Sequence, residues 1–318
     1  MDPAALNIMN DIVLPAGRSA VELVLFLLLP VMVLMLSLMR LLEAWKALDW
    51  IVALLAPLVR PFGLTGLGVF AAVQISFVSF AAPMATLTMM EQRGASDRHL
   101  AAILALVLAM AQANTSLPLT AMGLSLGPML LFSLIGGLVA AATAYHLTGR
   151  RLSDAEHLTS DEAPHHPDAA SPKAVLDVIN HAGAEAFKIS LGALPLILLS
   201  LVAVTALKQI GAVDALTRLL SPALGLAGID PALVLPTVTK YLAGGTGALG
   251  VLDTMIHHGQ IGATLLNQSA GFLIHPLDIP GVAILISAGR RVATVWKPAA
   301  IAACLGIAVR TAAHILWF

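Results

Sequence analysis

The chain has 318 residues, of which 58% are hydrophobic and only 11% are charged, and its mean hydropathy is +0.91. A soluble domain carries about 25% charged residues, so this composition excludes a soluble globular protein and a disordered chain. The 17 basic and 18 acidic residues leave no basic excess for nucleic acid. Because the apolar runs are too long for strands and aromatic residues are only 5%, the sequence predicts an all-α polytopic membrane protein.

The first half of the chain, residues 1–148, is predicted to open with a short amphipathic helix. The segment 47–62 is predicted to be interfacial or re-entrant, because it carries Asp49, Trp50 and Arg60. The segments are, in chain order, a long membrane helix near 20–42, the interfacial or re-entrant segment 47–62, a helix over 65–91, a fourth helix over 98–114 that ends at a break at Pro118, and a last stretch interrupted at Gly127 and Pro128.

A polar linker over residues 149–173 is predicted to separate two membrane repeats, residues 1–148 and residues 174–318. It holds eight charged residues in 25, together with several prolines and histidines, so it is typical of a solvated loop. The charged residues are Arg150, Arg151, Asp154, Glu156, Asp161, Glu162, Asp168 and Lys173.

The two halves repeat each other at an offset of 165 residues. Residues 47–63 and 212–228 share six identities in seventeen pairs, where about one or two are expected by chance. The second half is therefore predicted to hold the same segments over 187–209, 212–227, 230–256 and 260–275, with a last stretch interrupted by Arg290-Arg291 and by Lys297-Pro298. Broken helices in corresponding positions of two repeats indicate a transporter with a site near the bilayer midplane, and we favour inverted repeats.

One polar group lies deep inside an apolar run of the second half. If that helix begins near Asp230, Lys240 lies about 15 Å along it, which is mid-depth. A charged side chain at that depth needs an anion, a cluster of carbonyl groups or a solute. Gly244 and Gly245 follow it and allow the helix to unwind and expose backbone groups to a ligand. The alternative is that Lys240 pairs internally while the glycines only permit close helix packing.

The polar residues within the apolar runs are distributed asymmetrically over the two halves. This arrangement favours a single site at the interface of the repeats, where amides and hydroxyls bind a polar organic solute through several hydrogen bonds. The alternative is that each Ser or Thr bonds back to its own helix. The predicted site residues are Gln74, Asn114, Thr115, Ser116, Lys240, Gly244, Gly245, Thr246, Asn267, Gln268 and Ser269.

A second set of side chains has the chemistry of metal ligands. Asp253 and His257 share a helix face at i, i+4, and His275 and Asp278 follow further along the chain. Carboxylates and imidazoles bind divalent metals, so these four residues are the weaker candidates for a metal site. The simpler interpretation of Asp253 and His257 is an interfacial cap at a helix end.

The architecture and the run Lys240-Tyr241-x-Ala243-Gly244-Gly245-Thr246 resemble the nucleoside-recognition, or Gate-domain, membrane proteins of bacteria. That family is related to the concentrative nucleoside transporters and to the membrane part of the ferrous-iron transporter FeoB. The resemblance covers both halves of the chain. It implies that re-entrant hairpins and broken helices form a solute site around Gln74, Asn114, Thr115, residues 244–246 and Asn267.

These observations predict a multi-pass secondary transporter of the bacterial cytoplasmic (inner) membrane. Its solute is small and polar, nucleoside-like or anionic, and its coupling ion is a proton or sodium. We expect no cofactor, no nucleic-acid partner and, by analogy, a homo-oligomer in the lipid bilayer. The alternatives are a divalent-metal permease and a non-transporting membrane assembly or partner protein. An enzyme is not expected, because the H-E-x-x-H and G-x-x-x-x-G-K-[ST] motifs do not occur.

Overall fold

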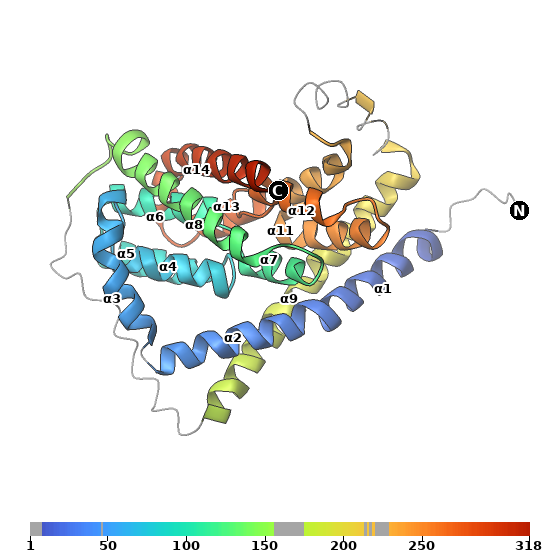
Figure 1. Cartoon of the computed structure of the whole chain (residues 1–318), viewed down its shortest axis with the longest axis horizontal. Helices are drawn as coiled ribbons and strands as arrows, with labels where there is room; N and C mark the ends of the chain where they lie inside the picture. The colour runs from blue at the N-terminus through green and yellow to red at the C-terminus, as the bar shows by residue number, and fades with distance from the viewer. Residues whose placement is uncertain (1–7, 46, 156–174, 213–214, 216–217, 220–228) are drawn as a thin grey trace, which may run out of the picture.

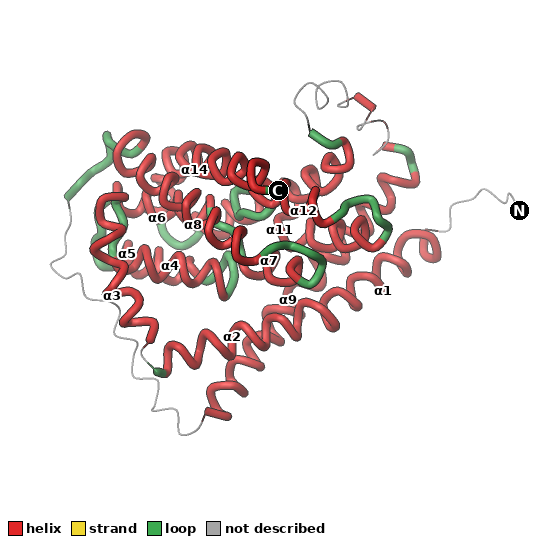
Figure 2. Tube along the Cα trace, in the orientation of Figure 1, coloured by secondary structure: helices red, strands yellow, loops and turns green. Residues whose placement is uncertain are grey.

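The computed structural model of the protein describes residues 8–45, 47–155, 175–212, 215, 218–219 and 229–318. Within these residues every regular element is a helix, which confirms the predicted all-α class (Figure 2). Five of the described helical runs are long and apolar enough to cross a membrane, or six if one strongly bent pair counts as a span. The multi-pass membrane architecture is therefore confirmed, whereas the inversion of the repeats stays a prediction.

Two long helices lie side by side along one edge of the molecule (Figure 1). The first is continuous from Ile8 through α1 (Leu14–Glu22) to the end of α2 (Leu29–Ala44), with π-helical stretches before each. The second is α9 (Val175–Gln209). An ion pair of 2.7 Å between Arg40 Nη2 and Glu185 Oε2 joins them.

The short amphipathic helices predicted before these two long helices are not separate elements. The backbone at Val13 and Glu22 is helical, so the first helix runs on without interruption. Pro15 lies inside this continuous helix, close to the join between the π-helical stretch and α1, and does not interrupt it.

The segment after α2 bends sharply, as expected for a re-entrant element. Helix α3 (Ala47–Val59) and the short 3-10 turn Arg60–Phe62 end at Gly63, whose φ of 75° is left-handed. The residues 52–62 and the next helix, α4 (Gly66–Phe77), are inclined at 105° to each other. The counterpart segment over 212–227 lies mostly outside the described residues, as do residues 156–173 of the polar linker.

The prediction of one continuous helix over 65–91 is wrong. The structure has two helices there, α4 and α5 (Pro83–Gln92), with a connection over residues 78–82. The helical backbone is lost at Val78, with φ −112° and ψ −80°, and Pro83 lies in the first turn of α5, a position that tolerates proline. The first half therefore contains a helical hairpin where the sequence indicated a single span.

A buried helix forms the centre of the remaining block of helices. In α6 (Asp97–Ala109) residues 100–109 are all buried, as expected for a helix that is apolar on every face. It packs against α8 (Leu126–Thr143) and α14 (Arg290–Trp317). These two helices approach so closely that a methyl group at Gly136 or Gly306 would collide with the backbone carbonyl of the other glycine.

The break after α6 lies earlier than predicted. It falls at residues 110–112, and Pro118 lies inside the next helix, α7 (Ala113–Thr120). Met110 and Gln112 have extended backbone, with ψ of 156° and 129°. In the second half the break is where the sequence predicted it, around Pro276, between α12 (Ala263–Leu273) and α13 (Ile279–Ile286).

Of the predicted interruptions in the two last stretches, those at Gly127-Pro128 and Lys297-Pro298 are wrong, whereas the one at Arg290-Arg291 coincides with the start of α14. Gly127 and Pro128 lie in the first turn of α8, a position that tolerates proline. Helix α14 runs through Lys297 and Pro298 without ending, although a proline inside a helix costs about 3 kcal/mol. The second half is interrupted between α13 and α14, directly before Arg290-Arg291.

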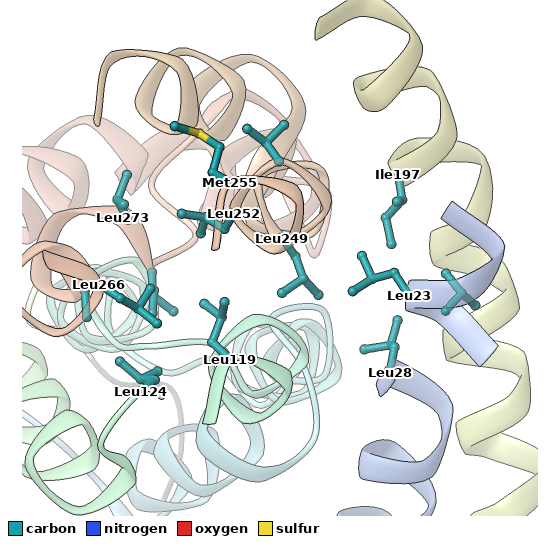
Figure 3. Packing of buried hydrophobic residues seen from close by; sticks show 14 of the residues in the cluster. Leu23, Leu28, Leu119, Leu124, Ile197, Leu249, Leu252, Met255, Leu266 and Leu273 are labelled. Atoms are coloured by element: carbon teal, nitrogen blue, oxygen red, sulfur yellow. The ribbon is translucent and has the colours of Figure 1, made fainter. Parts of the chain in front are cut away.

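An apolar cluster attaches the two long helices to the block. Leu23 and Leu28 from the first long helix and Ile197 from α9 point toward Leu249 and Leu119 (Figure 3). Leu249 belongs to α11 (Val234–His257), and Leu119 belongs to α7. The helices that carry most of the predicted site residues are thus positioned against the long pair by buried leucine and isoleucine side chains.

Candidate functional site

Helix α11 is broken at the predicted glycine pair. Gly244 has φ 78° and ψ 174°, which interrupts the helical backbone, and Gly245 and Thr246 follow it as buried residues. A positive φ of this kind is strained for any residue with a side chain, so glycine is required here. The predicted unwinding at Gly244 is therefore confirmed.

The start of α7 meets this break from the other half of the chain. The Nδ2 group of Asn114 donates a hydrogen bond of 2.8 Å to Oγ1 of Thr246. Gly245 lies so close to the side chains of Gln112 and Thr115 that a methyl group there would collide with both. Gln112 and Thr115 are themselves joined by a hydrogen bond of 3.0 Å, so this contact between the halves is closely packed.

The hairpin of α4 and α5 contributes to the same region. The backbone N–H of Phe80, in the hairpin connection, donates to Oδ1 of Asn114 at 3.4 Å. Gln74 accepts a hydrogen bond of 2.7 Å from the hydroxyl of Thr86, which joins the two helices of the hairpin. Asn114 therefore has one side-chain bond to the hairpin and one to α11.

Lys240 is fully buried and paired within the chain. Its Nζ lies 2.9 Å from Nδ1 of His275, 2.9 Å from the carbonyl oxygen of Leu277 and 3.6 Å from Oδ2 of Asp278. It also lies 4.1 Å from the centroid of the Tyr241 ring, within the range of a cation–π contact. Of the two interpretations of the sequence, this geometry agrees with internal pairing.

The other predicted site residues make contacts of a different kind. Asn267 bonds to the backbone of Gly123, Ser125 and Ala263, which fastens the loop after α7 to α12. The hydroxyl of Ser269 bonds back to its own helix, and Gln268 is half-buried. Ser116 is buried on α7. Within the described residues, Asn267, Gln268 and Ser269 do not hydrogen-bond to Asn114 or Thr246, so their part in a site stays a prediction.

The four weaker metal candidates do not form one site. Asp253 and His257 pair at 3.2 Å near the end of α11, whereas His275 and Asp278 surround Lys240. In the described part of the chain no group of three or more His, Cys, Asp or Glu side chains is arranged to hold a metal ion. The structure therefore does not bring these four residues into one cluster: a lysine ammonium lies between one pair, and the other pair stands apart, so a metal site stays a prediction.

Two residues at the breaks were not predicted. Gln112 lies against Gly245, as described above. Arg310, on α14, is fully buried, and its guanidinium donates to the carbonyl oxygens of Ala109 at 2.8 Å, Ile274 at 2.9 Å and Ala270 at 3.3 Å.

Arg310 therefore holds the carboxyl ends of α6 and α12, one broken helix from each half, where the backbone carbonyls carry partial negative charge. The sequence signal was present, because Arg310 is a charge inside the apolar run of the last helix.

A cavity of about 180 Å³ lies elsewhere, between α1, α9 and the second part of α11. Ser19, Thr205, Thr254 and His258 supply its polar groups. It lies further along α11 than the break, so it is not part of the contact between the halves.

The class of protein defined by this arrangement is a multi-pass helical membrane protein in which broken helices from both halves meet. Residues 25–129 match the family model described as Gate, nucleoside recognition, which confirms the predicted resemblance. No curated protein matches the chain.

Among solved structures, the chain is similar to CNTnw in an inward-facing substrate-bound state, with a TM-score of 0.68 and 17% identity over 91% of this chain and 74% of that one. A variant of CNTnw in an outward-facing state gives a TM-score of 0.65, at the same identity and coverage. The protein thus has the fold of the concentrative nucleoside transporters.

Proposed function

We propose that the protein is a membrane transporter that binds a nucleoside-type solute where α7 meets the break in α11. The observation that carries the proposal is the hydrogen bond between Asn114 and Thr246, which joins the two halves beside the unwound backbone at Gly244. Amide, hydroxyl and free backbone groups suit the hydroxyls of a sugar and the polar edge of a base. The match to a nucleoside-recognition family model supports this class of solute.

The charge distribution favours a neutral nucleoside over an anionic solute. The ammonium of Lys240 already has Asp278, His275 and a carbonyl group as partners, so it is not free to neutralise an anion. The side chains at the proposed site, Gln112, Asn114, Thr115 and Thr246, are all uncharged.

Transport requires that the site be exposed to each side of the membrane in turn. CNTnw has been solved in inward-facing and outward-facing states, and this chain has a similar fold. We propose that the block of helices that carries the site changes its position relative to the long pair of α2 and α9. Coupling to a proton or sodium, the bacterial cytoplasmic membrane and a homo-oligomer remain predictions. Catalysis is no part of the proposal.

Counterflow in proteoliposomes tests the proposal. Purified protein is reconstituted with unlabelled nucleoside inside, and uptake of labelled nucleoside is followed. We expect uptake by the natural protein and by Gly192→Ala, a matched control because a methyl group at Gly192 meets open space. Asn114→Ala is expected to lose most of the uptake. If the natural protein exchanges no nucleoside, the proposed solute is wrong.

A further inference from the structure

The break between α12 and α13 surrounds a buried positive charge that belongs to the chain itself. The Nζ atom of Lys240 has three partners in this break: a nitrogen of His275, the carbonyl oxygen of Leu277 and the carboxylate of Asp278. Two of these distances are 2.9 Å and the third is 3.6 Å. The side chains of Lys240 and His275 are fully buried, so water does not replace any of these partners.

The three partners belong to the types of group that bind cations. Imidazole nitrogen, carbonyl oxygen and carboxylate oxygen are common metal ligands. The N–H of Leu277 also donates to Nδ1 of His275, at 3.1 Å, so that nitrogen is an acceptor. Oδ2 of Asp278 has no hydrogen bond in the described structure and faces Lys240. Without the ammonium, the break would hold acceptor groups and a buried negative charge with no cation.

The ammonium also connects two broken helices of the fold. Lys240 precedes the break at Gly244 by four residues on α11. Asp278 caps the start of α13 through a bond of 2.8 Å from the N–H of Gly281, and its Oδ1 lies 3.6 Å from where a methyl group on Gly244 would be. One charge therefore joins the part of α11 beside its break to the break between α12 and α13.

We propose that the side chain of Lys240 is a tethered cation that fills a cation-binding site formed by His275, the carbonyl of Leu277 and Asp278. The site has the chemistry for a monovalent metal ion or a small primary alkylammonium ion, and the lysine occupies it permanently. The second half of the protein therefore needs no external ion to hold its broken helices together. This inference does not depend on which solute is transported.

Replacement of the lysine tests the proposal, because it should empty the site. Lys240→Ala and the natural protein are purified in detergent with choline, which is too large for the site, as the cation. Thermal unfolding is then measured with added sodium, potassium or ethylammonium. We expect the variant to unfold at lower temperature in choline, and its midpoint to rise by about 5 °C at a cation concentration about 100 times its dissociation constant. The natural protein should not respond to the choice of cation.

A double variant separates cation binding from general salt effects. It also tests the proposal if the single variant folds poorly. Lys240→Ala with Asp278→Asn removes both charges, and replacing both members of a buried pair is tolerated far better than removing one. We expect the double variant to fold and to show no dependence on the cation.

Three results would overturn the proposal. One is a folded Lys240→Ala protein with the same midpoint in all four cations. Another is an equal cation response in the double variant. The third is a double variant that does not fold. Nucleoside counterflow is a separate measurement, so failure here leaves the proposed transport function standing.

Discussion

The break after α6 in the first half and the break after α12 in the second half each separate a long helix from a short one, but their side chains differ. In the first half, residues 110–112 lead into α7 with the neutral side chains of Gln112, Asn114 and Thr115. In the second half, residues 274–278 contain His275 and Asp278, and the ammonium of Lys240 contacts both side chains. The two halves thus carry neutral side chains at one break and a buried lysine with its carboxylate partner at the other.

What the two breaks share is Arg310. Its guanidinium bonds to the last carbonyls of α6 and of α12, so the ends of both broken helices are held by one side chain. A cation at the carboxyl end of a helix is favourable, and here one charge serves two ends in an environment without water.

The largest effect is therefore expected from Arg310→Met, which removes this shared support and tests whether the breaks depend on each other. The substitution leaves the buried carbonyls of Ala109 and Ile274 without this partner, and each unpaired carbonyl costs about 1–3 kcal/mol, so we expect a loss of at least about 2 kcal/mol in stability. Thermal unfolding of purified protein measures it. Arg18→Met is the matched control, because Arg18 is exposed. Equal midpoints for the two variants would show that the guanidinium does not hold the helix ends.

A smaller effect is expected from Gly245→Ala, which tests the closeness of the contact at the first break. The new methyl group would collide with Gln112 and Thr115, and overpacking of this kind costs about 1–3 kcal/mol. Binding of nucleoside should be lost as well, because the unwound backbone is displaced. The control is Gly192→Ala in α9, where a methyl group has open space. Nucleoside binding by Gly245→Ala equal to that of the control would contradict the geometry at this break.

The interaction between Asn114 and Thr246 is smaller again, and a double-mutant cycle isolates it. Asn114→Ala, Thr246→Ala and the pair together are compared with the natural protein by thermal unfolding. Because the bond is buried, we expect a coupling energy of about 1 kcal/mol. Strictly additive effects would mean that the two halves are not coupled through this pair.

The smallest effect is expected outside both breaks, at the ion pair of Arg40 and Glu185. Their side chains are 43% and 35% exposed, and exposed pairs contribute about 0–1 kcal/mol. Glu185→Gln should therefore lower the unfolding midpoint by little, and added salt should reduce the difference further. A loss as large as that of Arg310→Met would show that the long pair of helices, rather than the breaks, dominates stability.

The sequence predicted the features that follow from local chemistry. Long apolar runs predicted the membrane helices, and Gly244-Gly245 predicted the break in α11, because only glycine adopts that backbone without strain. Asn114 and Thr246 were expected to share a site although they are far apart in the chain, because polar side chains are rare inside such runs. The structure brings this pair within hydrogen-bonding distance.

The sequence could not predict features that depend on distant residues. The break after α6 falls at residues 110–112 and not at Pro118, and the carbonyl of Ala109 just before it is held by Arg310, some 200 residues later in the chain. The pairing of Lys240 with Asp278 likewise depends on how α11 packs against α13. Proline and glycine signals locate possible breaks, but tertiary contacts decide which of them form.

Equilibrium binding of nucleosides to purified protein tests the central claim most directly. Titration calorimetry with a panel of purine and pyrimidine nucleosides is carried out on the natural protein, Gly192→Ala and Asn114→Ala. The account predicts that the natural protein and Gly192→Ala bind a nucleoside with equal affinity, and that Asn114→Ala binds it about ten times more weakly, which corresponds to about 1.4 kcal/mol. Equal affinity in Asn114→Ala, or no nucleoside binding by the natural protein, would contradict it.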